Sequence, residues 1–122
     1  MQTVIWILRI GVFGIFFGHG VFALKINEKW LSYLEVVGIG EDMGLKLMPL
    51  IGGLDLAVAL ATLIKPWKPV LIWAVIWTFS TALIRPIAGE PIWAFVERAG
   101  NWATPLVLLL LLSQKDKLKP GN

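Results

Sequence analysis

Residues 93–112, WAFVERAGNWATPLVLLLLL, are long and apolar enough to cross a bilayer, yet their first half carries Glu97, Arg98 and Asn101. About 20 predominantly apolar residues span the hydrocarbon core as a helix. A charged side chain at the centre of the bilayer costs about 2.5–3.5 kcal/mol on insertion scales, so it needs partners on neighbouring helices. The stretch therefore predicts that the rest of the chain supplies further membrane-spanning helices.

The composition favours a membrane protein and excludes several classes of site. Of the 122 residues, 57% are hydrophobic and 16% are charged, whereas a typical soluble domain has about 45–50% and about 25%. There is no cysteine and only one histidine, which excludes disulfides, thiolate metal sites and bis-histidine haem ligation within one chain. The basic residues lie near predicted loops and the C-terminal tail, so no nucleic-acid-binding surface is expected.

The apolar blocks predict an all-α fold, a polytopic membrane protein in which residues 1–122 form a single transmembrane domain. It is a four-transmembrane-helix bundle with a short interfacial amphipathic helix between the first and second spans. Trp30 and Tyr33 of that short helix are expected at the level of the lipid headgroups. The predicted spans cover about 3–24, 47–64, 69–85 and 92–112, the interfacial helix about 27–37, and a solvated tail 113–122.

The proline and glycine residues between the apolar blocks support these boundaries. The prolines of KPWKP at 65–69 end the second span, Arg85-Pro86 ends the third, and Gly38 is expected to end the short helix. Four spans place both termini on one side, and the positive-inside rule assigns that side to the cytoplasm. The expected location is a prokaryotic cytoplasmic membrane, and the lysines expected on the cytoplasmic side are Lys65, Lys68, Lys115, Lys117 and Lys119.

The intramembrane polar residues form two predicted groups. At about 1.5 Å per residue, Arg9 and Asp55 lie at similar depths and are expected to form an ion pair. The second group lies nearer the outer surface and consists of His19, Arg85, Glu97, Arg98 and Asn101. Such groups can fix the register of the helices, or they can bind an anionic or carbonyl-bearing ligand. No second histidine or cysteine accompanies His19, so no metal site is predicted.

Aromatic residues and glycines offer further candidates, each with a simpler alternative. Trp73 and Trp77 share one helix face at i, i+4 and are candidates for a wall against a flat ligand, although packing against lipid or a neighbouring helix gives the same pattern. Small residues allow two helices to approach closely. The glycines predicted to serve helix packing are Gly11, Gly14, Gly18, Gly52 and Gly53.

Two stretches resemble the DoxX-like family of small four-helix integral membrane proteins: LRIGVFGIFFGHG at 8–20, with Arg9 and His19, and PLIGGLDLAVALATLI at 49–64, with Asp55 beside paired glycines. The resemblance implies a four-helix bundle. Some members are small membrane subunits of thiosulfate:quinone oxidoreductases, and others accompany membrane oxidoreductase complexes in oxidative-stress responses. This chain departs from a self-sufficient redox enzyme because it lacks cysteines and a nucleotide-binding motif. The acidic residue of its second predicted span is Asp55, whose side chain is shorter than that of glutamate by one methylene.

Three functions remain open at this point. The first is an accessory or anchoring subunit of a larger, quinone-linked redox complex, without catalytic residues of its own. The second is a quinone- or lipid-binding redox component that uses the outer polar group with Trp73 or Trp77. The third is a small transporter or proton path. No covalently bound cofactor is expected; the expected partners are membrane lipid, a quinone, and other membrane-protein subunits or further copies of the chain, with no nucleic acid.

Overall fold

The computed structural model describes residues 1–26 and 28–117, and within these residues the chain is helical and contains no strand. Four segments are long and apolar enough to cross a membrane: α1, α3, α4 and the stretch Trp93–Lys117 that contains α5 and α6. Four apolar helices of this length indicate an integral membrane protein. The helices are α1 (Gln2–Leu24), α2 (Glu28–Val36), α3 (Glu41–Ile64), α4 (Lys68–Ile87), α5 (Trp93–Val96) and α6 (Ala99–Lys117).

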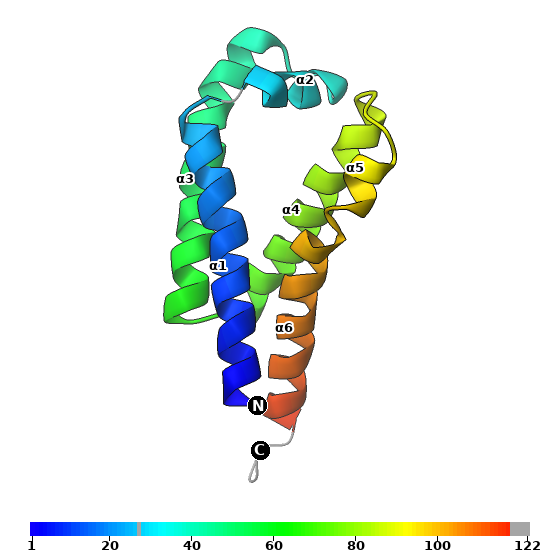
Figure 1. Cartoon of the computed structure of the whole chain (residues 1–122). Helices are drawn as coiled ribbons and strands as arrows, with labels where there is room; N and C mark the ends of the chain where they lie inside the picture. Colours follow the sequence, from blue (N-terminus) through cyan, green and yellow to red (C-terminus); the bar gives the residue numbers. More distant parts are fainter. Residues whose placement is uncertain (27, 118–122) are drawn as a thin grey trace.

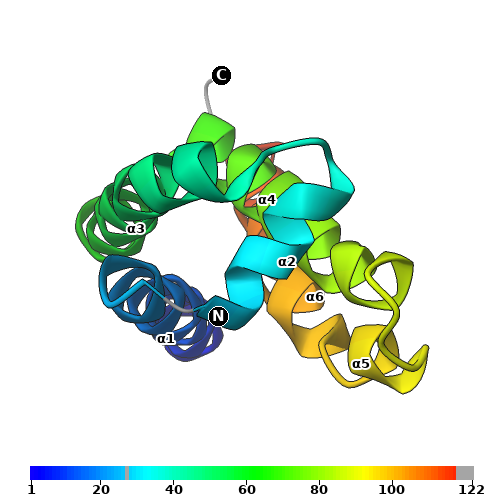
Figure 2. The same ribbon diagram turned by 90° about the horizontal axis from the view of Figure 1, so that it is seen from above.

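The long helices form two antiparallel pairs. α1 packs along α3, α4 packs along α6, and α1 also contacts α6, so these contacts join the pairs. α3 and α4 touch much less, although they follow each other in the chain. Figure 1 shows the two pairs diverging toward one end, where α2 crosses between them, while the start of α1 and the end of α6 share the other end. Seen from above, α2 lies across the space between α3 and α4 (Figure 2). The narrow end of the bundle therefore holds the core, and the wide end has room for a site.

The core is built from one strip of α1 and the facing helices. Ile5, Val12 and Phe16 recur at spacings of seven and four, which places them on a single face of α1. Side chains from α3, α4 and α6 complete the cluster. These are Val58, Ala59, Leu71, Ala74 and Leu108.

Close contact between α1 and α3 depends on Gly20 and Gly52. An added Cβ at either position would lie 3.0 Å from the backbone oxygen of the other glycine. Gly52 was predicted to serve packing; Gly20 was not. Gly14, Gly18 and Gly53 make no such contact within the described chain, because an added Cβ at those three positions would meet no atom within 4 Å, and their packing role stays a prediction. The spacing of the glycines showed a smooth strip but not which helix face meets the neighbour.

Gly11 bears out the packing prediction through a different helix. An added Cβ there would lie 3.2 Å from the methyl group of Thr104 in α6. The two packing glycines of α1 therefore face different partners, α6 at Gly11 and α3 at Gly20.

Several helix ends differ from those predicted. α3 begins at Glu41, six residues before the predicted start, because Glu41 and Asp42 occupy its first turn, where acidic side chains stabilise the helix dipole. α4 continues past Arg85-Pro86 to Ile87. The predicted tail begins at residue 113, but α6 extends to Lys117, and its last turn contacts α4 through the pair Lys68–Asp116 at 2.9 Å. Residues 114–117 are exposed, as predicted for the tail, and residues 118–122 lie outside the described residues.

The predicted turns at proline and glycine residues are confirmed. Lys65, which precedes a proline, has extended backbone angles (φ −155°, ψ 106°), and Pro69 occupies the first turn of α4. Gly38 follows α2 with φ 87°, a conformation that glycine adopts without steric cost. These residues fix where the chain reverses between the long helices.

The stretch around Glu97 is not one continuous helix. α5 ends at Val96 and α6 begins at Ala99, so the helical register is interrupted at Glu97 and Arg98. The side chain of Glu97 is 67% exposed and lies 2.6 Å from Arg98, its neighbour in sequence. The predicted face of Glu97 and Asn101 assumed an unbroken helix, and that assumption is wrong here.

Candidate functional site

A cavity of about 480 Å³ lies at the wide end of the bundle, between α1, α3 and α4 and beneath α2. Cavities that bind drug-sized ligands fall in the range of about 300–1,000 Å³ and are mostly apolar with a few polar groups. The walls of this one are largely aliphatic and aromatic. The polar side chains that line it are His19, Tyr33, Asp55, Ser80, Thr81 and Arg85. We call it the α2 cavity.

Asp55 is the most deeply buried acidic group of the α2 cavity. Its side chain belongs to α3, is 1% exposed, and its Oδ1 atom accepts no hydrogen bond from any described residue. The indole of Trp77 lies within hydrogen-bonding reach of the carboxyl group. The indole nitrogen of Trp73 is also buried and has no acceptor among the described residues. A buried donor or acceptor without a partner costs about 1–3 kcal/mol, so both residues carry a polar atom whose hydrogen bonding is incomplete within the described chain.

Trp73 and Trp77 form one wall of the cavity. Their rings are stacked, with centroids 5.4 Å apart and an angle of 15° between the planes. Both side chains line the cavity and also pack against the hydrophobic core. The two interpretations offered by the sequence, a wall for a ligand and ordinary packing, therefore describe different parts of the same side chains.

α2 covers one end of the cavity, and we call it the roof. A polar network joins α2 to α4. Arg85 Nη1 donates to the Tyr33 hydroxyl at 2.9 Å, and that hydroxyl donates to Glu90 Oε2 at 2.6 Å. Lys29 Nζ lies 3.4 Å from the other carboxylate oxygen of Glu90. Tyr33 is 8% exposed and Arg85 is 6% exposed. We call these four residues the α2 latch, because they join a short helix that has little core of its own to the end of α4.

The sequence did not identify Tyr33 or Glu90 as functional residues. Tyr33 is the only tyrosine in the chain, and its side chain is buried, at 8% exposed. Its expected position at the level of the lipid headgroups stays a prediction. The signal available was the amphipathic face of the short helix. That face predicted a buried side but not the residue 52 positions away that it meets.

The charges of the α2 latch make its stability depend on pH. The hydrogen bond from Tyr33 and the nearby ammonium group of Lys29 lower the pKa of Glu90 below its ordinary value of 4.5. Burial and the hydrogen bond to Glu90 raise the pKa of Tyr33. A carboxyl group whose folded-state pKa is lowered stabilises the structure above the unfolded-state value and loses that contribution as the pH falls through the folded-state pKa.

We therefore expect α2 to loosen as the pH falls below about 4.5, where Glu90 becomes protonated. Hydrogen exchange of the α2 amides, corrected for the intrinsic effect of pH, measures this loosening. At every pH, the Glu90→Gln protein should show the weak protection of α2 that the unaltered chain shows only at low pH. Its protection should therefore not depend on pH. A Glu90→Gln protein with the pH profile of the unaltered chain would show that another group controls α2.

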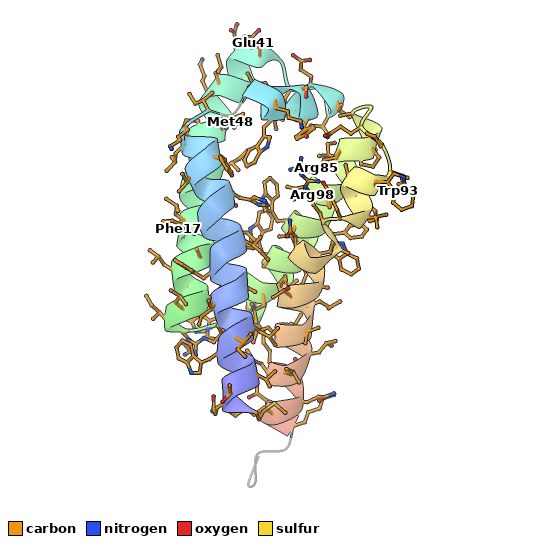
Figure 3. All side chains as sticks on the ribbon, in the orientation of Figure 1. Phe17, Glu41, Met48, Arg85, Trp93 and Arg98 are labelled. Carbon is orange, nitrogen blue, oxygen red and sulfur yellow. The ribbon has the colours of Figure 1, made fainter. Side chains whose placement is uncertain are left out.

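His19 lies on α1 beneath the roof. Its ring meets that of Trp30 in α2 edge to face, with centroids 5.7 Å apart. Both residues line the α2 cavity. Figure 3 shows Arg85 and Arg98 pointing toward the same region below α2. His19 and Arg85 are the basic side chains that line the cavity, and Asp55 is its acidic one.

The predicted ion pair between Arg9 and Asp55 is wrong. Arg9 Nε donates to the carbonyl oxygen of Thr62 at 2.9 Å, and Arg9 Nη2 donates to the carbonyl oxygen of Leu63. The guanidinium carbon also lies 3.8 Å from the ring centroid of Trp6. Carbonyls in the last turn of a helix lack intrahelical donors, so Arg9 bonds to the C-terminal end of α3, about two turns from Asp55.

Three other predicted site residues lie outside the cavity. Glu97, Arg98 and Asn101 are not among its lining residues. Arg98 donates to the carbonyl oxygen of Ala94 at 2.8 Å and pairs with Glu97, so its contacts stay within its own segment. The predicted outer group therefore reduces to His19 and Arg85, joined by Asp55, Trp73 and Trp77. No group of three or more histidine, aspartate or glutamate residues in the described chain could hold a metal ion.

Comparisons with models of protein families, with curated proteins and with solved structures found no match. The resemblance to the DoxX-like family therefore stays a prediction.

Proposed function

We propose that this chain is a four-span integral membrane protein that binds a small amphipathic molecule, taken from the bilayer, in the α2 cavity. In this proposal α2 lies at the membrane surface and both termini are cytoplasmic. Leu54 of α3, which is 47% exposed, and Ser80 of α4, also exposed, both line the cavity. The cavity therefore opens on the side where α3 and α4 separate, a side that faces lipid in a bilayer.

The observation that carries the proposal is that Asp55 and Trp73, which line one apolar cavity, each have a buried polar atom without a hydrogen-bond partner among the described residues. A ligand that offers both a donor and an acceptor would satisfy them. The stacked rings of Trp73 and Trp77 suit a flat ring, since offset stacking on an aromatic wall is favourable. A quinol, or a lipid headgroup with a hydroxyl or ammonium group, offers both, whereas an oxidised quinone has only acceptor oxygens and can bond to Trp73 Nε1 alone. The chain acts here as a binding protein, and no residue is assigned a catalytic role.

The opening between α3 and α4 provides the test. In Ser80→Trp a large side chain replaces a small one at the rim, where the serine hydroxyl bonds only to the carbonyl oxygen of Ile76. We expect this variant to reduce the binding of a short-tailed quinone, decylubiquinone, by at least about tenfold. Equilibrium dialysis against the full chain in lipid nanodiscs, with empty nanodiscs as the blank, measures the bound fraction.

Ile76→Trp is the matched control. Ile76 lies one turn away on α4, is exposed, and does not line the cavity. Binding should match that of the unaltered chain. Equal loss in both variants, or quinone binding that Ser80→Trp leaves unchanged, would place the ligand elsewhere on the protein.

A second candidate, the accessory or anchoring subunit, is favoured by a different feature. Gly14 and Gly18 form a G-x-x-x-G pair on α1, and an added Cβ at either would meet open space. A pair of this kind lets a helix of another protein approach closely. The resemblance to the DoxX-like family points the same way. A protein that co-elutes in fixed stoichiometry from the native membrane would support this candidate.

A further inference from the structure

Asp55 has no cationic partner in the part of the chain that the structure describes. The ion pairs found there involve Glu90, Asp116 and Glu97. Arg9 of α1 and Arg85 of α4 are engaged elsewhere, Arg9 with the end of α3 and Arg85 with Tyr33. An ionised carboxylate in an apolar interior is costly unless it is paired. The cavity therefore contains an acidic group whose counter-charge the protein does not supply.

The aromatic residues around Asp55 add to its attraction for positive charge. The indole of Trp77 reaches its carboxyl group, and Trp73 stacks on Trp77. Trp30 and Tyr33 line the same cavity at the roof. The face of a tryptophan ring attracts a cation within about 6 Å of its centroid, and cages of aromatic rings recognise quaternary ammonium groups. A carboxylate beside a wall of tryptophan is a suitable site for a cation with apolar substituents.

Arg85, one of the two basic residues that line the cavity, lies far enough along α4 to leave this end free. Arg85 follows Trp77 by eight residues on α4, a rise of about 12 Å along the helix. Its charge is also shared with Glu90 through the Tyr33 hydroxyl. A cation in contact with Asp55 would be about three times closer to the carboxylate than this rise. Arg85, which bonds to α2, is therefore separated from Asp55 along the cavity.

We infer that the α2 cavity binds a lipophilic cation, a quaternary onium ion or a protonated amine with apolar substituents, whose positive centre contacts Asp55 beside Trp77. This inference rests on the proposed function, that the cavity is a ligand site, and it names the class of ligand. A neutral quinone can accept a hydrogen bond from Trp73 but supplies neither a donor nor a counter-charge to Asp55. The cation supplies the counter-charge and uses the aromatic wall as well.

Two probes of nearly the same shape and opposite charge test the inference. Tetraphenylphosphonium and tetraphenylborate are compared by equilibrium dialysis against the full chain in nanodiscs of zwitterionic lipid, with empty nanodiscs as the blank. The cavity should bind the phosphonium saturably at one site per chain and should not bind the borate above the blank. Asp55→Asn should weaken phosphonium binding by at least about tenfold. Glu97→Gln, which removes an exposed carboxylate outside the cavity, should leave it unchanged.

Asp55→Glu keeps the experiment decisive if the asparagine variant does not fold. It retains the negative charge and should retain the preference for phosphonium over borate. Equal binding of the two probes, or full phosphonium binding in a folded Asp55→Asn protein, would overturn the inference. Quinone binding that Ser80→Trp blocks, without any phosphonium binding, would overturn the inference and leave the proposed function standing. If neither probe nor the quinone binds in the cavity, both proposals fail.

Discussion

Gly52→Val is expected to lower the free energy of unfolding by about 2–3 kcal/mol, because overpacking of a close helix contact forces the backbones apart. An added Cβ would lie 2.9 Å from Leu24 Cγ and 3.0 Å from the carbonyl oxygen of Gly20. The leucine side chain can move, but the carbonyl belongs to the backbone of α1. The contact between α1 and α3 is the most extensive in the bundle, so its loss should be seen as a lower midpoint of thermal unfolding in mild detergent.

Gly53→Val is the control for this result. Gly53 is the next residue on the same helix, and an added Cβ there would meet no atom within 4 Å. The substitution should change the unfolding free energy by no more than about 0.5 kcal/mol, as for other surface positions. Equal destabilisation by the two variants would mean that α1 and α3 do not meet at Gly20 and Gly52.

Arg85→Met is expected to have the second large effect, a loss of about 2–3 kcal/mol, since hydrogen bonds to charged groups contribute about 1.5–3 kcal/mol. Methionine keeps much of the apolar stem but removes the donor to the Tyr33 hydroxyl. The buried hydroxyl then keeps only its bond to Glu90. α2 has no other polar bond to α4 of comparable burial among the described residues, so its amides should exchange with solvent much faster.

The matched control is Arg98→Met. Arg98 is near Arg85 in the fold (Figure 3), but its hydrogen bonds go to Ala94 and Glu97 of its own segment. Exchange of the α2 amides should not change in this variant. Faster exchange after Arg98→Met, or unchanged exchange after Arg85→Met, would show that the α2 latch does not hold the roof.

The sequence predicts where the helices of this protein lie along the chain better than it predicts which helices pack against each other. Hydropathy locates the four long apolar segments because a spanning helix must satisfy its backbone internally over about 20 residues. The prolines at 65–69 and Gly38 locate reversals, because each acts on its own backbone. These signals are local, and local signals can be read without knowing which helix lies opposite.

The Arg9–Asp55 prediction failed because depth alone does not determine a contact. The two residues were placed at similar depths, but the face of α3 that carries Asp55 turns toward Trp77 of α4. Arg9 instead donates to a backbone carbonyl oxygen in the last turn of α3. A prediction that pairs charged side chains only with one another does not consider backbone carbonyls as partners. Rotation about each helix axis decides such pairings, and periodicity fixes it only where one face is clearly more apolar than the other.

The prediction of the outer polar group was partly wrong for a different reason. The predicted face of Glu97 and Asn101 follows from a spacing of four on one helix, and the chain interrupts that helix at Glu97 and Arg98. His19, Trp73, Trp77 and Arg85 lie on uninterrupted helices, and all four line the cavity. Periodicity was therefore reliable only where the helix was continuous.

The most direct test of a ligand site in the α2 cavity is native mass spectrometry of the chain extracted from its own membrane in mild detergent. The proposal predicts one small-molecule adduct per chain on the unaltered protein and on Ile76→Trp, and its loss from Ser80→Trp. A chain that carries no adduct, or an adduct that Ser80→Trp retains in full, would contradict the proposal. A partner protein in fixed stoichiometry, with the cavity empty, would instead identify the chain as a subunit.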